Sequence, residues 1–309
     1  MPSLYSENPA GFDSIKANLI TDFTDIEKII YKSDLCVFYD ACSFRYHSTL
    51  PNSIKKYFSD YISSKNGVIV ITKCIIMELG GTNKELHANT INYFKFMLSQ
   101  GLKIILLEEE NIFSLLESEY KPARVNDILK YAVRAFNSKQ STIKQTIDLK
   151  AELKDILSDR QISTNSLCTK FFTEVRKNKE EDDNLGEELI GICIYMLLHL
   201  TGEDSLKFTI FTDDKGAALR INEKLQSIPN GITTKKAVII STPRLTQLLV
   251  NESLLTSITD IEAILSSCKI EQKYILGIKK NDLNLDEYKH NANDWAKLLL
   301  QPNEVRIIF

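Results

Sequence analysis

The chain has 309 residues, of which 43% are hydrophobic and 26% charged, with only 11 Gly and 7 Pro. This composition is ordinary for a globular protein and excludes a fibrous or low-complexity chain. The formal net charge of -3 does not by itself indicate a nucleic-acid or membrane partner. The length is enough for one large domain, or for a typical domain with an insertion or a tail.

The first residues, MPSLYSENPAGFD, contain neither a basic start nor an apolar stretch, so we expect no secretory signal. The longest apolar run, residues 189–198, is about half of the roughly 20 residues needed to cross a bilayer. The six cysteines lie far apart without zinc-ligand spacing, mostly in apolar runs: Cys36, Cys42, Cys74, Cys168, Cys193 and Cys268. We expect reduced core cysteines and a cytoplasmic protein.

Five short apolar runs without a helical period predict β-strands, at residues 35–39, 67–71, 102–107, 207–211 and 237–241. Helical patterns occur between and after them, at residues 52–63, 74–79 continuing through 83–98, 186–200, 215–225 and 243–250. This alternation indicates βαβ units and a mostly parallel sheet covered on both faces. The predicted fold class is α/β, with three layers (α/β/α) around a five-stranded sheet.

The segment between the third and fourth strands is too long for a single crossover, and residues 111–179 are predicted to form several helices. Residues 120–179 contain 13 Lys and Arg against 6 Asp and Glu, so this stretch carries +7 and the remainder -10. We interpret it as a basic helical insertion. Lys-rich helices are usually solvated faces. The functional alternative is contact with a nucleic-acid backbone through Lys121, Arg124, Lys130, Arg134, Lys139 and Lys144.

The pattern divides the chain into three parts. Residues 1–34 form an N-terminal arm, residues 35–250 contain the predicted sheet, and residues 251–309 form a C-terminal extension. In the extension, residues 257–268 predict a helix, residues 282–300 a second helix and residues 305–309 a terminal strand. We therefore expect a mainly helical tail.

Acidic residues follow two of the predicted strands. Asp40 comes directly after the first strand, and Asp213 and Asp214 follow the fourth strand after Thr212. In an open parallel sheet, ligands bind beyond the carboxyl ends of the strands, near the point where the strand order reverses. We expect these carboxylates to meet at that edge.

Two helices contribute further acids. Glu78 lies in the short apolar helix after the second strand, and a rise of 1.5 Å per residue keeps it near the same edge. Glu187 begins a strongly apolar helix, in which Gly191 is expected to let the helix approach the sheet closely. Asp183 and Glu188 compete with Glu187 for this third acidic position.

These motifs, in this order, resemble the signature of PIN-domain nucleases. The matching segments are strand-Asp at residues 37–40, Thr-x5-Glu-Leu at 72–79, Gly-Glu at 186–187 and strand-Thr-x-Asp at 211–214. The segment Ser-Thr-Pro-Arg-Leu at 241–245 also resembles the last strand-to-helix step of that family. The third acidic position is more often Asp in the family, and only the Thr-x-Asp spacing selects Asp214 over Asp213. The resemblance covers roughly residues 35–250 and implies a large PIN-like variant with an insertion and an extension.

The resemblance implies a metal-dependent endoribonuclease that hydrolyses RNA phosphodiester bonds with Mg²⁺ or Mn²⁺ and leaves a 5′ phosphate and a 3′ hydroxyl. The catalytic and metal-binding residues would be Asp40, Glu78, Glu187 and Asp214, with Asp183 and Asp213 as secondary candidates. Hard cations prefer carboxylate oxygens and water, which is consistent with an acidic set without His or Cys. Ser43 or Thr212 is expected to orient an acid or a water molecule.

RNA is the expected substrate, with DNA as the alternative. The family also implies a toxin of a toxin-antitoxin pair or a stress or defence effector. An antitoxin, another regulatory protein or a second copy of the chain is then an expected partner.

Other hypotheses stay open. Asp40 and the pair Asp213-Asp214 have a structural interpretation as helix caps, and Glu187 as an acid favoured by the helix dipole. A scaffold that binds nucleic acid or protein without cutting is a second hypothesis. A phosphatase-like hydrolase is a third, disfavoured because that chemistry normally requires a second Asp at the position of Cys42.

Overall fold

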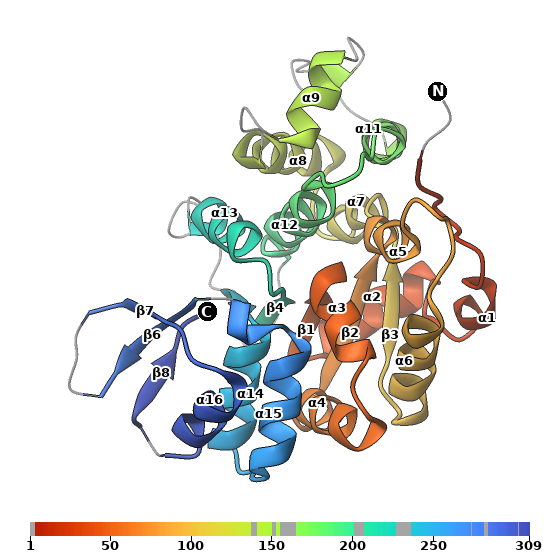
Figure 1. Ribbon diagram of the computed structural model, residues 1–309. Helices are drawn as coiled ribbons and strands as arrows, with labels where there is room; N and C mark the ends of the chain where they lie inside the picture. Colours follow the sequence, from red (N-terminus) through yellow and green to blue (C-terminus); the bar gives the residue numbers. More distant parts are fainter. Residues whose placement is uncertain are drawn as a thin grey trace.

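The computed structural model describes residues 4–136, 141–149, 153–154, 165–200, 207–226, 236–272, 274–280, 284–301 and 303–309 (Figure 1). Its central sheet has five strands in the order β3-β2-β1-β4-β5, and every pairing is parallel. The strands are β1 (Leu35–Tyr39), β2 (Gly67–Thr72), β3 (Ile104–Leu107), β4 (Lys207–Phe211) and β5 (Lys236–Ile240). The prediction of an α/β fold around a five-stranded parallel sheet is confirmed.

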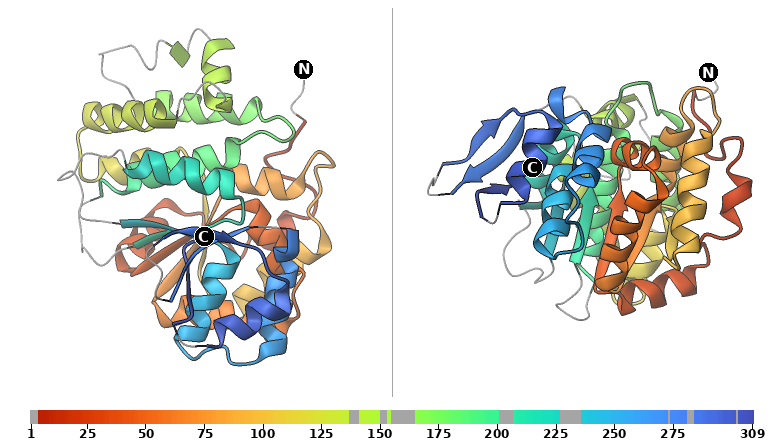
Figure 2. Two further views of the ribbon diagram at one scale, coloured as in Figure 1. Left: turned by 60° about the vertical axis from the view of Figure 1, so that its left-hand side comes forward. Right: turned by 60° about the horizontal axis from the view of Figure 1, so that its bottom comes forward.

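Helices cover both faces of this sheet, as a parallel sheet requires. One face carries α3 (Ala41–Ser48), α4 (Asn52–Ser64), α6 (Ala88–Ser99) and α14 (Thr242–Asn251). The other carries α7 (Asn111–Glu117), α12 (Leu185–Leu197) and α13 (Lys215–Gln226). Figure 2 shows α12 and α13 on the opposite side of the sheet from α14. All residues of β1 are buried, which explains its continuous apolar sequence.

The strand order reverses next to β1. From β1 the chain builds β2 and β3 outward on one side, and then returns to place β4 on the other side of β1. The backbone N–H of Asp40 donates to the carbonyl of Phe211 at 2.9 Å, so the carboxyl ends of β1 and β4 are joined directly. The acids that follow these two strands therefore lie side by side.

Two helices differ from the sequence prediction. The helical stretch expected from residue 74 through 98 is interrupted, because α5 (Lys73–Gly80) is followed by Gly81, whose positive φ of 60° is incompatible with a continuing helix. The helix α3, directly after β1, was not predicted. Its N-cap is Asp40, whose side chain accepts a hydrogen bond from the N–H of Ala41.

The N-terminal arm contains α1 (Asp13–Lys16) and α2 (Phe23–Lys32) and covers the outer edge of β3. The N–H of Ile20 donates to Ile104 at 2.9 Å, and the N–H of Leu106 donates to Ile20 at 3.0 Å. This bridge pairs part of a strand edge that would otherwise be open to other chains.

The described residues of the insertion form α7, α8 (Pro122–Phe136), α9 (Thr142–Leu149) and α11 (Asn165–Lys177). Figure 2 shows α8, α9 and α11 as a further layer outside α12. The helix α8 packs against α12. A Cβ on Gly191 of α12 would lie 2.3 Å from the ring of Phe136, so Gly191 accommodates α8. The expectation that this glycine brings α12 close to the sheet was wrong.

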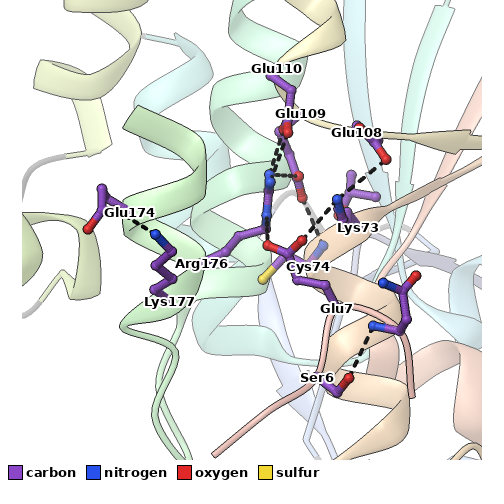
Figure 3. A network of polar contacts seen from close by, with 12 residues as sticks. Ser6, Glu7, Lys73, Cys74, Glu108, Glu109, Glu110, Glu174, Arg176 and Lys177 are labelled. Carbon is purple, nitrogen blue, oxygen red and sulfur yellow. Dashed lines mark hydrogen bonds and ion pairs between the residues drawn. The ribbon is translucent and has the colours of Figure 1, made fainter. Parts of the chain in front are cut away.

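A buried ionic network joins the insertion to the rest of the molecule (Figure 3). Arg176 of α11, with only 1% of its side chain exposed, donates to Glu109 at 2.6 Å and to Glu110 at 2.7 and 2.9 Å. It also donates to Glu7 of the N-terminal arm at 3.0 Å. Glu109 accepts the N–H of Cys74 in α5 at 2.9 Å. The guanidinium thus joins α11 to two segments distant in sequence, the N-terminal arm and residues 109–110.

The C-terminal extension contains α15 (Ile258–Ser267) and α16 (Ala292–Leu299), and also a small antiparallel sheet in the order β7-β6-β8. Its strands are β6 (Ile275–Lys279), β7 (Asp286–Tyr288) and β8 (Val305–Ile307). The helix near residues 257–268 and the terminal strand agree with the prediction. Of the described part of the stretch 282–300, predicted as a second helix, only α16 is helical, and residues 286–288 form β7 instead. The strand β6 was not predicted. No described helix is long and apolar enough to cross a membrane.

Candidate functional site at the carboxyl ends of the strands

Asp40 is held where β1 meets β4, with only 3% of the residue exposed. Its Oδ1 accepts the N–H of Ala41 at 2.7 Å, so the cap interpretation holds. Its Oδ2 accepts hydrogen bonds from Thr212 Oγ1 at 2.8 Å and from Cys42 Sγ at 2.7 Å. Burial raises the pKa of Asp40, and these hydrogen bonds act against that rise.

Glu78 projects from α5 toward the beginning of α12. Its carboxylate accepts the N–H of Gly186 at 3.2 Å and pairs with Lys179 Nζ at 3.0 Å. A Cβ on Gly186 would lie 2.5 Å from Glu78 Oε1, so only glycine permits this approach. Burial raises the pKa of Glu78 to about 7, although the positive charge of Lys179 opposes the rise.

Glu187 lies in the first turn of α12, next to Gly186. Among the described residues, its Oε2 is a buried oxygen without a hydrogen-bond partner. Burial raises the pKa of Glu187 to about 9, and the negative charges of Asp40 and Glu78 add to the rise. Such an orphaned oxygen is costly and calls for a ligand or a proton.

The adjacent Asp213 and Asp214 have different environments. The exposed Asp214 accepts the N–H of Ala217 at 2.8 Å and so caps α13, while its own N–H donates to Thr212 Oγ1 at 3.1 Å. The buried Asp213 accepts hydrogen bonds from Ser43 Oγ at 2.6 Å and from the N–H of Thr242 at 2.9 Å. Ser43 therefore orients Asp213, whereas Thr212 connects Asp40 and Asp214.

One cleft of about 450 Å³ is lined by Asp40, Glu78, Glu187 and Asp214 together. The four acids come from four separate segments of the chain. Asp183 also lines this cleft, and Asp213 does not. We call this the acidic cleft.

The three candidates for the third acidic position are now distinguished. Glu187 and Asp183 face the acidic cleft. Asp183 accepts the N–H groups of Glu180 at 2.7 Å and Leu185 at 3.1 Å, and it pairs with Lys179. Glu188 faces the insertion instead.

The Glu188 carboxylate accepts hydrogen bonds from Ser141 Oγ and from the N–H of Ile143, both at 3.1 Å. Burial raises the pKa of Glu188 to about 7, and these hydrogen bonds oppose that rise. Glu188 thus attaches α9 to α12 and is directed away from the acidic cleft.

The donors of the acidic cleft fit a divalent cation chemically, because they are carboxylate oxygens and one of them is buried without a partner. In their present positions, no three His, Cys, Asp or Glu side chains of the described ranges could hold a metal ion. A cation held by three of these carboxylates would therefore require them to move closer together.

Two cationic side chains in the acidic cleft were missed from the sequence. Lys179 pairs with Glu78 and Asp183, and Arg45 of α3 donates to the carbonyl oxygen of Glu78. The spacing of four residues between Lys179 and Asp183 was a signal of their ion pair. No local pattern places Arg45, because its contact depends on how α3 packs against α5.

The basic residues of the insertion lie elsewhere. Lys121, Arg124, Lys130 and Arg134 belong to α8 or its start, and none of them lines the acidic cleft. Lys144 of α9 pairs with Asp148, and Lys139 lies outside the described residues. Their contact with nucleic acid stays a prediction.

No known protein family, curated protein or solved structure matches this chain.

Proposed function

We propose that the protein is a metal-dependent endoribonuclease that hydrolyses RNA phosphodiester bonds at the acidic cleft. The observation that carries this proposal is the convergence of Asp40, Glu78, Glu187 and Asp214 at the reversal of the strand order. Carboxylates gathered in a partly buried cleft repel one another, and a divalent cation relieves that repulsion. When bound, Mg²⁺ or Mn²⁺ would activate water and neutralise charge on the phosphate.

The residues of the acidic cleft would have different roles. Asp40 and Glu187 would hold the cation, because Asp40 is buried and Glu187 has a buried oxygen without a hydrogen-bond partner. Neither carboxylate has a cationic partner among the described residues. Asp214 would complete the set from the exposed rim. Thr212 would keep Asp40 oriented through its 2.8 Å hydrogen bond. Arg45, on the wall of the same cleft, would contact a phosphate.

The choice of RNA over DNA comes from the motif resemblance to PIN-domain nucleases, and so does a role as a toxin with an antitoxin partner. The cleavage assay therefore includes both nucleic acids. Purified protein is incubated with single-stranded RNA, structured RNA and DNA in Mn²⁺, with a parallel series in EDTA.

Cleavage should require Mn²⁺ and fall by at least about 100-fold in Asp40→Asn and in Glu187→Gln. The matched control is Glu188→Gln, on the same helix but directed toward the insertion, which should retain activity. Equal activity in wild type and Asp40→Asn would reject the proposal.

A second candidate function is a binding module on the same scaffold that does not cut. One observation favours it. Within the described part of the chain, no three His, Cys, Asp or Glu side chains are arranged so that they could hold a metal ion. RNA binding without cleavage, unchanged by EDTA and by Asp40→Asn, would establish this alternative.

A further inference from the structure

Lys179 is an unusually buried cation within the acidic cleft. It follows α11, and only 3% of its side chain is exposed. Its Nζ lies 3.0 Å from Glu78 Oε1, forms an ion pair with Asp183, and donates to the carbonyl of Glu180 at 3.3 Å. The ring of Tyr5 lies 5.1 Å from the same nitrogen. Two carboxylates, a backbone carbonyl and an aromatic ring therefore surround the ammonium of Lys179.

The charges of the acidic cleft are compensated on one side only. Glu78 and Asp183 share Lys179. Within the described ranges, Asp40, Glu187 and Asp214 form no ion pair with Lys, Arg or His, and Glu187 Oε2 has no hydrogen-bond partner. The carboxylates without a cationic partner thus lie between the ends of β1 and β4 and the first turn of α12.

A divalent cation beside Glu78 and Asp183 would be close to the ammonium of Lys179. Two cations of like charge at short range in a buried site repel each other strongly. In addition, Lys179 and the backbone N–H donors already occupy oxygens of both carboxylates. On the Asp40 and Glu187 side, no Lys, Arg or His of the described residues forms an ion pair with either carboxylate, and Glu187 Oε2 accepts no hydrogen bond.

We infer that Lys179 serves as an internal cation for Glu78 and Asp183, so that the protein binds one divalent cation, at Asp40, Glu187 and Asp214, instead of two. This inference rests on the proposed metal site. It assigns Lys179 a positioning role that determines the number of cations bound. It also assigns Glu78 to the lysine rather than to the metal.

The test is a calorimetric titration of the full chain with Mn²⁺, which counts bound cations without measuring activity. Wild type should bind one Mn²⁺ per chain. Lys179→Met removes the charge but keeps a long side chain, and it should bind two. The matched control is Lys177→Met, whose lysine is 59% exposed and pairs with Glu174, and it should bind one.

A further variant covers the case in which Lys179→Met does not fold. Lys179→Met combined with Glu78→Gln removes one charge of each sign, so it keeps the net charge of wild type and should bind one Mn²⁺. Circular dichroism confirms that each variant is folded before titration.

The outcomes separate the two proposals. Two Mn²⁺ bound by wild type would overturn the inference about Lys179 and leave the metal-dependent nuclease standing. One Mn²⁺ bound by both wild type and folded Lys179→Met would also overturn it, as would two bound by the double variant. No binding by wild type would overturn the inference and the metal site together.

Discussion

Two carboxylates that line the acidic cleft also cap helices. Asp40 caps α3 through Oδ1, while its Oδ2 accepts hydrogen bonds from Thr212 and Cys42 at the acidic cleft. Asp214 likewise caps α13 and lines the same cleft. Helix capping and metal binding were competing interpretations of these acids. Helix capping does not exclude metal binding, because the cap hydrogen bond uses only one of the two carboxylate oxygens.

The pKa of Glu187 predicts how stability changes with pH in the absence of metal. Its folded pKa is about 9 against an ordinary value of 4.5, so between these values the folded chain holds a proton that the unfolded chain has lost. The free energy of unfolding therefore decreases as pH rises through this window. Glu78, with a folded pKa of about 7, adds to the decrease between 4.5 and 7.

Glu187→Gln should reduce this decrease and make the metal-free protein about 1 to 3 kcal/mol more stable than wild type at pH 8. Urea unfolding in EDTA measures how the free energy of unfolding changes with pH. The measurement runs from about pH 5 to about pH 9, which are roughly the limits of the titration window. A wild-type stability that increases over this range would contradict the assigned burial of Glu187.

At the scale of elements, α12 connects the acidic cleft with the insertion. Its two glycines face different partners, because Gly186 lies against the carboxylate of Glu78 and Gly191 against the ring of Phe136. The first contact belongs to the cleft, and the second to the packing of α8. The sequence shows two similar glycines on one apolar helix, so only the structure distinguishes their roles.

Alanine substitutions should separate these two roles. Gly186→Ala should force Glu78 away from the start of α12, directly beside the proposed ligand Glu187, and so lower Mn²⁺ affinity by about 10-fold. It should cause little loss of stability, since alanine favours a helix. Gly191→Ala should leave Mn²⁺ affinity unchanged and cost about 1 to 3 kcal/mol of stability, because its Cβ overlaps Phe136. Calorimetry and urea unfolding measure the two effects, and a similar profile for both variants would refute this division.

At the scale of the whole molecule, Arg176 joins the insertion, the N-terminal arm and the segment after β3 through Glu7, Glu109 and Glu110. Burial raises the pKa of Glu109, while the charge of Arg176 and the N–H of Cys74 oppose the rise. Removing the guanidinium would leave this buried carboxylate without a counter-charge. The network therefore stabilises the packing of these three parts of the chain against one another.

Arg176→Met should destabilise the protein by about 3 to 5 kcal/mol at pH 7, because buried charges lose their partner. The loss should be smaller in acid, where the carboxylates are protonated. Lys177→Met, the neighbouring exposed position, should change stability by less than about 0.5 kcal/mol. Thermal and urea unfolding of both variants provide the measurement, and equal effects would show that the Arg176 network is not important for stability.

The sequence by itself determined the sheet and the approximate position of four acids. Strands buried on both faces must be continuously apolar, and carboxylates directly after them must lie at the carboxyl edge. It also predicted the helices of the insertion and the terminal strand of the tail. These features depend on local patterns, which a sequence displays directly.

Only the tertiary structure decided which acids face the same cleft. It directed Asp213 toward Ser43 and Thr242, and Glu188 toward the insertion, because side-chain direction depends on how distant elements pack. For the same reason it placed Lys179 between Glu78 and Asp183. Local sequence patterns predict where an acidic residue lies along the backbone. The packing of other segments determines which group its side chain contacts.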